Sequence, residues 1–243
     1  LENWFYVFRG CAAGVEDSYH AGYRRSIMAK EPRQNTYNRI IEASLQLFNE
    51  EGERQISTNH IAAHLGISPG NLYYHFRNKD EIIIQLYKRY SEELLVLLSR
   101  EQLPDSVQAI VEYMADIFNV LWRYRFLFSD VNTLLLRNVE LSGEHSAFTQ
   151  EKAAPLTVRQ LNGAMAAGVI QGTEDEIKSL SLNIWIITKY WFDFDGSIRG
   201  RETLTEESKV RGVERVMSLM RPHLNLEHLA EFDRLMEELA TVG

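Results

Sequence analysis

Apolar residues recur at helical spacing along most of this sequence, and residues that favour helix ends punctuate the pattern. Ile40 and Ala43 begin a run of this kind, and Gly52 follows it at a position that suits the end of a helix. Thr173 with Glu176 three residues later has the spacing of a capping box, which is typical of helix starts. Only five of the 243 residues are proline, and few segments alternate polar and apolar residues. The sequence therefore predicts an all-α protein of about nine or ten helices.

Two further signals place helix boundaries in the second half of the chain. Asp105 with Gln108 again has capping-box spacing, so a long helix is expected to start there. Pro222 separates two expected helices over residues 205–220 and 226–240, because proline cannot continue a helix interior.

The amino-acid composition excludes several classes of protein. A single cysteine, Cys11, excludes a disulfide framework and a cysteine-rich zinc site, and it favours a reducing compartment. There is no run of about 18 apolar residues, so no membrane span is expected. We therefore expect a cytoplasmic protein that needs no cofactor.

The net charge of −8 is distributed unevenly along the chain. Residues 30–90 carry eight basic and seven acidic side chains, whereas the residues after 90 carry 15 basic and 24 acidic ones. A nearly neutral N-terminal third on an acidic body is compatible with a small nucleic-acid surface.

Three domains are expected from these patterns. Residues 1–27 read as an extension outside the core fold, since Met28 followed by Ala-Lys-Glu resembles an ordinary translation start. Residues 28–80 form an N-terminal domain of short helices, and residues 81–243 form a larger helical domain with longer ones.

The N-terminal domain contains two short apolar-faced segments joined by a tight turn. Ser57 or Thr58 suits the cap of the first helix, and Gly66 suits its end. Ser68 followed by Pro69 suits the start of the second helix, since the missing N–H of proline costs nothing there. These are the proportions of a helix-turn-helix.

The second of these helices has two different faces. On a helical wheel of residues 69–76, Leu72 and Phe76 share one side, which is expected to pack inward. The opposite side carries Gly70, Asn71, Tyr74 and His75, with Tyr73 at the border. An uncharged, hydrogen-bonding face of this kind suits contact with base edges and phosphates.

Lys79 lies at the start of the next expected helix, where the helix dipole disfavours a cation. A phosphate bound beside it would explain the residue. A solvated surface lysine is the alternative interpretation.

The residues that carry a family resemblance are Ile40-x-x-Ala43-Ser44-x-x-Leu47-Phe48-x-x-x-Gly52 and Ile61-Ala62-x-x-Leu65-Gly66-Ile67-Ser68-x-Gly70-Asn71-Leu72-Tyr73-Tyr74-His75-Phe76-x-x-Lys79. Over residues 33–82 the chain resembles the DNA-binding domain of TetR-type bacterial transcriptional regulators. The resemblance implies a three-helix DNA-binding domain with a helix-turn-helix, followed by a larger helical domain for ligand binding and dimerisation. It also implies a homodimer that places one helix of each subunit in a major groove of double-stranded DNA.

Carried over by position, the resemblance implies DNA contacts for Thr58, Ser68, Pro69, Gly70, Asn71, Tyr73, Tyr74, His75 and Lys79. Pro69 stands where the family often has a lysine, so one cationic contact is missing. Asn71 stands where the family usually has a small hydroxyl residue. Its amide suits bidentate pairing with adenine or a phosphate contact, and both interpretations stay open.

For the larger domain, the resemblance implies dimerisation through helices near residues 175–195 and 205–220. It also implies a small-molecule site, for which we expect an apolar pocket lined by Trp122, Tyr124, Phe126, Phe128 and Trp185. Few ionisable residues fall on the inward faces, which favours a small apolar or weakly polar effector. The predicted function is a ligand-responsive transcriptional repressor that releases its operator when the effector binds.

Three other interpretations remain. One is activation instead of repression, which depends on where the operator lies relative to a promoter. A DNA-binding architectural or cell-division regulator would need no effector, and a closed apolar cavity within one subunit would count against it. An all-helical enzyme is disfavoured because the sequence lacks a phosphate loop, a nucleophile elbow and a metalloprotease motif. His60 and His64 have metal-compatible spacing without a third ligand, and we expect no metal site. Asp193 and Asp195, close to Gly196, are expected to mark a helix end.

Overall fold

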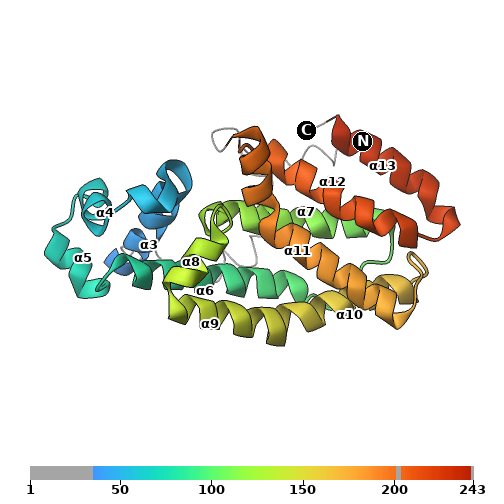
Figure 1. Cartoon of the computed structure of the whole chain (residues 1–243), viewed down its shortest axis with the longest axis horizontal. Helices are drawn as coiled ribbons and strands as arrows, with labels where there is room; N and C mark the ends of the chain where they lie inside the picture. The colour runs from blue at the N-terminus through green and yellow to red at the C-terminus, as the bar shows by residue number, and fades with distance from the viewer. Residues whose placement is uncertain (1–34, 201–203, 242–243) are drawn as a thin grey trace. The chain divides into compact units, whose positions relative to one another are not determined.

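The computed structural model describes residues 35–200 and 204–241. The extension expected at residues 1–27 lies outside them. Helices and short helical turns form the described residues, and the β pairing found there is an isolated bridge between Ile170 and Leu224 (Figure 1). The all-α prediction is confirmed. Among the described helices, none combines the length and the apolar composition that a membrane crossing requires.

The chain divides into two compact units, one ending at Lys79 and the other beginning at Asp80. The helices of the first unit are α3 (Thr36–Leu47), α4 (Thr58–Leu65) and α5 (Pro69–His75). A π turn (Phe48–Gly52) and a 3-10 turn (Glu53–Gln55) extend α3 towards α4. The side chains that fill the interior of this unit are Ile40, Ile41, Phe48, Ile61, Leu72 and Phe76.

Local capping interactions determine where the two short helices α4 and α5 begin. The Ser57 hydroxyl accepts a hydrogen bond from the backbone N–H of His60 at 3.2 Å, and Gly66 ends α4 at a φ of 65°. The Ser68 hydroxyl accepts from the N–H of Asn71 at 3.2 Å, with Pro69 in the first turn of α5. Ser57, and not Thr58, is therefore the cap of α4, because its side chain reaches the third residue of the helix.

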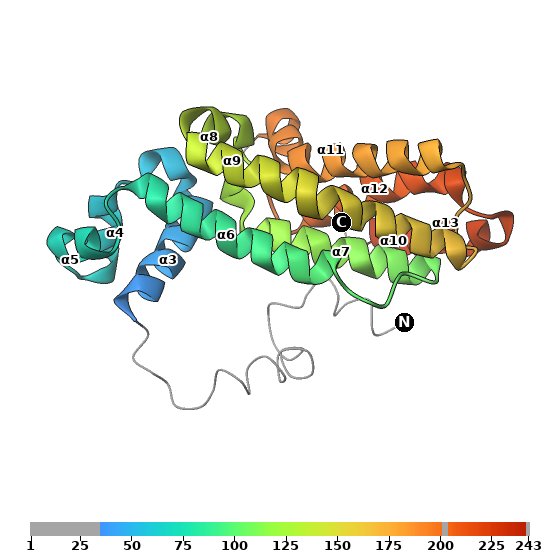
Figure 2. The ribbon, with the colours of Figure 1, turned by 90° about the horizontal axis from the view of Figure 1, so that it is seen from below.

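The second unit is built from longer helices. These are α6 (Lys79–Leu98), α7 (Val107–Arg123), α8 (Val131–Arg137), α9 (Val139–Ala147), α10 (Ala154–Ala166), α11 (Glu174–Arg199), α12 (Glu207–Met220) and α13 (Leu229–Ala240). A π turn (Phe148–Ala153) joins α9 to α10, and Figures 1 and 2 show the two helices following one continuous path. A 3-10 turn (Arg125–Leu127) separates α7 from α8.

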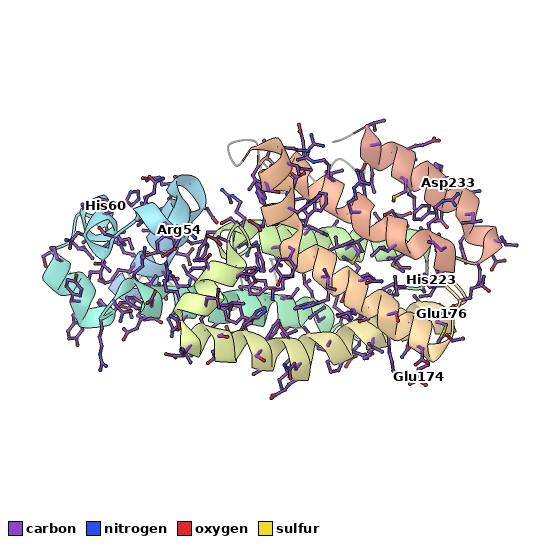
Figure 3. All side chains as sticks on the ribbon, viewed as in Figure 1. Arg54, His60, Glu174, Glu176, His223 and Asp233 are labelled. Carbon is purple, nitrogen blue, oxygen red and sulfur yellow. The ribbon has the colours of Figure 1, made fainter. Side chains whose placement is uncertain are left out.

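The starts of two helices test the capping predictions. At α11 the pairing of Thr173 with Glu176 is confirmed, since the Thr173 N–H donates to the Glu176 carboxylate at 2.7 Å. Figure 3 labels Glu176. At α7 the cap is Ser106, whose hydroxyl accepts from the Ala109 N–H at 3.1 Å. The expected cap at Asp105 was wrong by one residue.

The end of α11 also differs from the expectation. The helix continues past Asp193 and Asp195 to Arg199, and Gly200 ends it at a φ of 95°. Asp195 is buried and accepts from Arg211 of α12, with Nη2 and Oδ2 2.6 Å apart. The two acidic residues therefore lie inside a helix, and one of them joins α11 to α12.

Close packing of α12 against α7 depends on Gly212. A Cβ at this position would overlap the ring of Phe118, which is fully buried. α12 also packs along α11, as Figure 1 shows. The three helices thus form the closely packed centre of the second unit.

Candidate nucleic-acid interface and internal cavity

Helix α5 buries one side and exposes the other. Leu72 and Phe76 are buried, while the Tyr74 side chain is 84% exposed. Gly70, Asn71 and Tyr73 are exposed as well, and His75 is half-buried. The two faces predicted from the helical wheel are confirmed, and the described residues leave the outer one exposed to solvent.

Two hydroxyl groups converge beside this face. The Thr58 Oγ1 and the Tyr73 hydroxyl lie 3.2 Å apart, and both side chains are at the surface. Thr58 opens α4 and Tyr73 lies in α5, so the contact brings a side chain of each helix to one place. Hydroxyl groups placed this way suit hydrogen bonds to phosphate oxygens.

Aromatic contacts hold His75 at the end of α5. Its ring lies edge-on to Tyr37, with centroids 6.4 Å apart, and to Tyr74, with centroids 5.1 Å apart. Tyr37 also stacks on Phe76 at 4.8 Å. A residue of α3 therefore orients the last turn of α5.

Lys79 has three partners inside the first unit. Its ammonium donates to the carbonyl oxygens of Glu53 at 2.8 Å and Ile56 at 2.9 Å, and it pairs with the Glu53 carboxylate at 2.8 Å. An ammonium has three N–H donors, so these partners account for all of them. In this arrangement Lys79 fastens the segment after α3 to the start of α6.

The second unit contains an internal cavity of about 50 Å³. A cavity of about 10–15 Å³ by the same kind of measure holds one water molecule, so this one has room for a larger guest. Residues of α6, α7, α10 and α11 contribute most of its wall. Phe128 and Trp185 line it, as predicted.

Three other residues predicted for this pocket lie elsewhere. Trp122 packs against Phe192 with centroids 5.6 Å apart and beneath the Arg125 guanidinium. Phe126 and Tyr124 are buried but do not line the cavity. Leu121 lines it instead. Consecutive residues on a helix point in directions about 100° apart, so the aromatic neighbour of an inward-facing leucine turns away.

The cavity also has polar groups that the sequence analysis missed. Tyr113, His145, Gln160, Thr188 and Lys189 all line it. Gln160 and Thr188 occupy inward positions of α10 and α11 that the helical spacing marks as core. A polar residue at such a position is the signal that would have revealed them.

His145, which lines this cavity, forms a partly buried pair with Tyr87. The Tyr87 hydroxyl and the His145 Nδ1 lie 3.1 Å apart. Burial, together with the charge of Lys189, lowers the pKa of His145 to about 4. The imidazole is therefore neutral at pH 7.

Comparison with known proteins gives matches over both units. The model for bacterial regulatory proteins of the tetR family matches residues 40–86, and the TetR model for a bacterial transcriptional repressor matches residues 88–232. This second match spans more than half of the chain.

The chain belongs to the TetR family.

Individual TetR relatives agree with this assignment. An HTH-type transcriptional regulator of Staphylococcus aureus (strain USA300) is 35% identical over 129 residues, which are 51% of this chain and 64% of the relative. The match thus spans less than two thirds of that protein. A solved TetR-family transcriptional regulator from Marinobacter aquaeolei VT8 is 36% identical, with a TM-score of 0.75, and the match covers 84% of this chain and 98% of the other.

A more distant solved structure shares the TetR fold. It is a regulator from Saccharomonospora viridis in complex with choline, 13% identical with a TM-score of 0.59, and the match covers 76% of this chain and 96% of the other.

His60, one of the two histidines weighed as metal ligands, has a structural role in this TetR chain. Its Nδ1 accepts from the Ser57 N–H at 3.5 Å, which completes the capping box of α4 (Figure 3). In the described ranges there is no group of three or more side chains that could hold a metal ion.

Proposed function

We propose that this protein is a homodimeric transcriptional repressor that acts in the cytoplasm and releases its operator when a small molecule fills the cavity of the second unit. The observation that carries the DNA-binding part is the exposed face of α5, which rests on buried Leu72 and Phe76. Between Gly66 and Phe76 the sequence has no acidic residue, so nothing on this helix repels phosphate.

In this proposal α5 enters the major groove and the residues around it divide the contacts. Asn71 and Tyr74 reach base edges, and Gly70 lets the backbone approach. The contacts to the DNA backbone come from Thr58, Ser68, Pro69, Tyr73 and His75. Lys79 is left out of this set, because its three donors have partners within the first unit. We assign it the role of positioning the unit.

An apolar stripe on α11 supports the dimer. Leu182, Ile186, Phe194 and Ile198 are all exposed and repeat at multiples of four residues, so successive members are neighbours on a stripe that winds slowly around the helix. Packing this stripe against its copy across a two-fold axis removes the four side chains from water. The interface proposed for residues 175–195 and 205–220 thus centres on α11.

The cavity supports the effector part of the proposal. It lies within one subunit, and a regulator without an effector has no need of such a space. The likeness in fold to the regulator in complex with choline also fits a small-molecule site. A ligand in the cavity has to bind the DNA-free form more tightly than the DNA-bound form, because only differential affinity shifts the equilibrium.

The test begins with binding sites isolated from genomic DNA of the source organism by the purified full chain. Fluorescence anisotropy then measures the Kd of the wild type, Asn71→Ala, Tyr74→Ala and a control, Gln46→Ala. Gln46 is exposed on α3 and pairs with Glu50.

We expect Tyr74→Ala to weaken operator binding at least tenfold. Asn71→Ala should alter the preferred base at one position per half-site, and the control should bind as the wild type does. Equal affinity of all four proteins would contradict the proposed interface. An architectural protein would instead bind most fragments with similar affinity.

A further inference from the structure

Three polar atoms of the cavity wall have no partner. The Tyr113 hydroxyl, the Gln160 Oε1 and the Thr188 Oγ1 are buried and find no hydrogen-bond partner within the described part of the chain. Gln160 is 4% exposed and Thr188 is 6% exposed. A buried polar atom left unpaired destabilises the fold, so three of them around one space point to a ligand that pairs with them.

Gln160 shows which kind of group one end of the guest must carry. Its Nε2 donates to the carbonyl oxygens of Leu98 at 3.0 Å and Arg100 at 3.5 Å. These two acceptors fix the orientation of the amide, because a flipped amide would place oxygen against oxygen. The Oε1 is therefore an acceptor that needs an N–H or O–H from the guest.

The other polar end of the cavity is positively charged. Lys189 lines the wall beside Thr188, and its ammonium lies 5.0 Å from the centroid of the Tyr190 ring. No Asp or Glu is among the described residues that line the cavity. His145, also in the wall, is held neutral by burial and by Lys189. The electrostatic environment here favours an anion and opposes a cation.

The Lys189 end of the cavity lies near Tyr90, because the charge of Lys189 acts on His145 and the Tyr87 ring contacts both His145 and Tyr90. Gln160 is bound to the carbonyl oxygen of Leu98, at the last turn of α6, whereas Tyr90 lines the cavity eight residues earlier. Eight residues of an α-helix span about 12 Å. The wall between them is apolar and includes Leu94, Met114, Ile117 and Ile184.

Resting on the proposed effector role of this cavity, we propose that its ligand is a medium-chain carboxylate whose far end carries a hydrogen-bond donor. The carboxylate binds at Lys189 and Thr188, the chain lies along the apolar wall, and the far hydroxyl or amine pairs with Gln160 Oε1 and the Tyr113 hydroxyl. The ligand is thus more polar than the hydrophobic or weakly polar effector expected from the sequence.

The test measures binding of four eight-carbon probes to the full chain by isothermal titration calorimetry. The probes are octanoate, 8-hydroxyoctanoate, octan-1-ol and octylamine. They share the apolar body and differ only in their ends. We expect 8-hydroxyoctanoate to bind most tightly and octanoate more weakly. Octan-1-ol and octylamine lack the carboxylate, so each should bind at least tenfold more weakly than octanoate.

Variants then assign each end of the ligand. Lys189→Met should weaken octanoate at least tenfold and leave octan-1-ol unchanged, and Thr188→Val should weaken octanoate in the same direction. Gln160→Leu should abolish the advantage of 8-hydroxyoctanoate over octanoate. The control is Lys178→Met, an exposed residue of α11 that pairs with Glu174 at 2.6 Å. It should bind every probe as the wild type does.

Two results would overturn the inference: octylamine binding as tightly as octanoate, or octanoate affinity unchanged in Lys189→Met that has the thermal stability of the wild type. Operator binding, measured separately with each probe present, tests the proposed function. Octanoate that binds in the cavity but leaves operator affinity unchanged would support the ligand class and contradict the effector role.

Discussion

Lys79 stabilises the first unit through contacts with residues that are distant in the sequence. Its ammonium joins Glu53 and Ile56, which lie 26 and 23 residues earlier in the chain. A lysine is unusual at a helix start, where the dipole disfavours a cation, and its partners here are a carboxylate and two carbonyl groups. Contacts across such separations leave no periodic trace in the sequence, so this role could not be predicted.

Replacing Lys79 with methionine tests this role. We expect Lys79→Met to lower the free energy of unfolding by about 1–3 kcal/mol, because it removes the ammonium that pairs with the largely buried Glu53 carboxylate and binds two backbone carbonyl oxygens. Urea denaturation measures this change. The dependence of operator affinity on salt should keep its slope. A slope lowered by about one, with unchanged stability, would show that Lys79 binds a phosphate instead.

His145 gives the second unit a dependence on pH. Its pKa is about 4 in the folded protein, against an ordinary value of 6.5. Between these values the unfolded chain binds a proton that the folded protein does not. The stabilisation is therefore complete above pH 6.5 and is lost as the pH falls towards 4.

Urea denaturation at pH 7.5 and pH 5 checks this dependence. We expect the free energy of unfolding of the wild type to fall by up to about 2 kcal/mol from pH 7.5 to pH 5. The His145→Asn variant should not show this fall. Parallel losses in the two proteins would mean that the histidine titrates normally.

At the scale of the helix, the position of α12 depends on the close approach of Gly212 to the Phe118 ring of α7. Gly212→Ala places a methyl group against the buried Phe118 ring, so we expect a loss of about 1–3 kcal/mol in the free energy of unfolding. The matched control is Gly143→Ala in α9, where no atom lies near the new methyl group. That change should stabilise the protein by about 0.5–1 kcal/mol. Calorimetry measures the stability of the two variants against unfolding. Equal stabilities would contradict the packing described.

Helix ends could be predicted where the signal is local. Ser68-Pro69 and Thr173 with Glu176 cap their helices as the spacing indicates, because the bonds close within three residues. Asp105 and Ser106 are both good caps, and spacing alone could not separate them. Gly196 was mistaken for a helix end because a buried glycine inside a helix looks the same in sequence as a terminal one.

At the scale of the whole molecule, the proposed dimer depends on the α11 stripe. The double variant Ile186→Glu with Phe194→Glu places charges on an interface that would otherwise be apolar. We expect it to sediment as a monomer and to lose most of its operator affinity. Leu226→Glu, at another exposed apolar residue, is the control and should stay dimeric. A dimeric double variant would place the interface elsewhere.

The order of short and long helices could be predicted from the sequence, whereas the cavity lining could be predicted only in part. Short capped helices followed by long amphipathic ones predicted the order of the units. The cavity wall depends on which side chains of four helices meet. Phe128 and Trp185 were found there, whereas Trp122 and Phe126 were not, since hydrophobicity alone does not tell a cavity from a filled core.

The most direct measurement of the central claim is the DNA that the protein selects from a random pool. A dimer that reads duplex DNA with α5 should enrich an inverted repeat whose half-site centres lie about 10 base pairs, or a multiple of that, apart. The same selection with Asn71→Ala should change one base in each half-site and keep the spacing. A single unrepeated motif, or a repeat that Asn71→Ala leaves unaltered, would contradict the account.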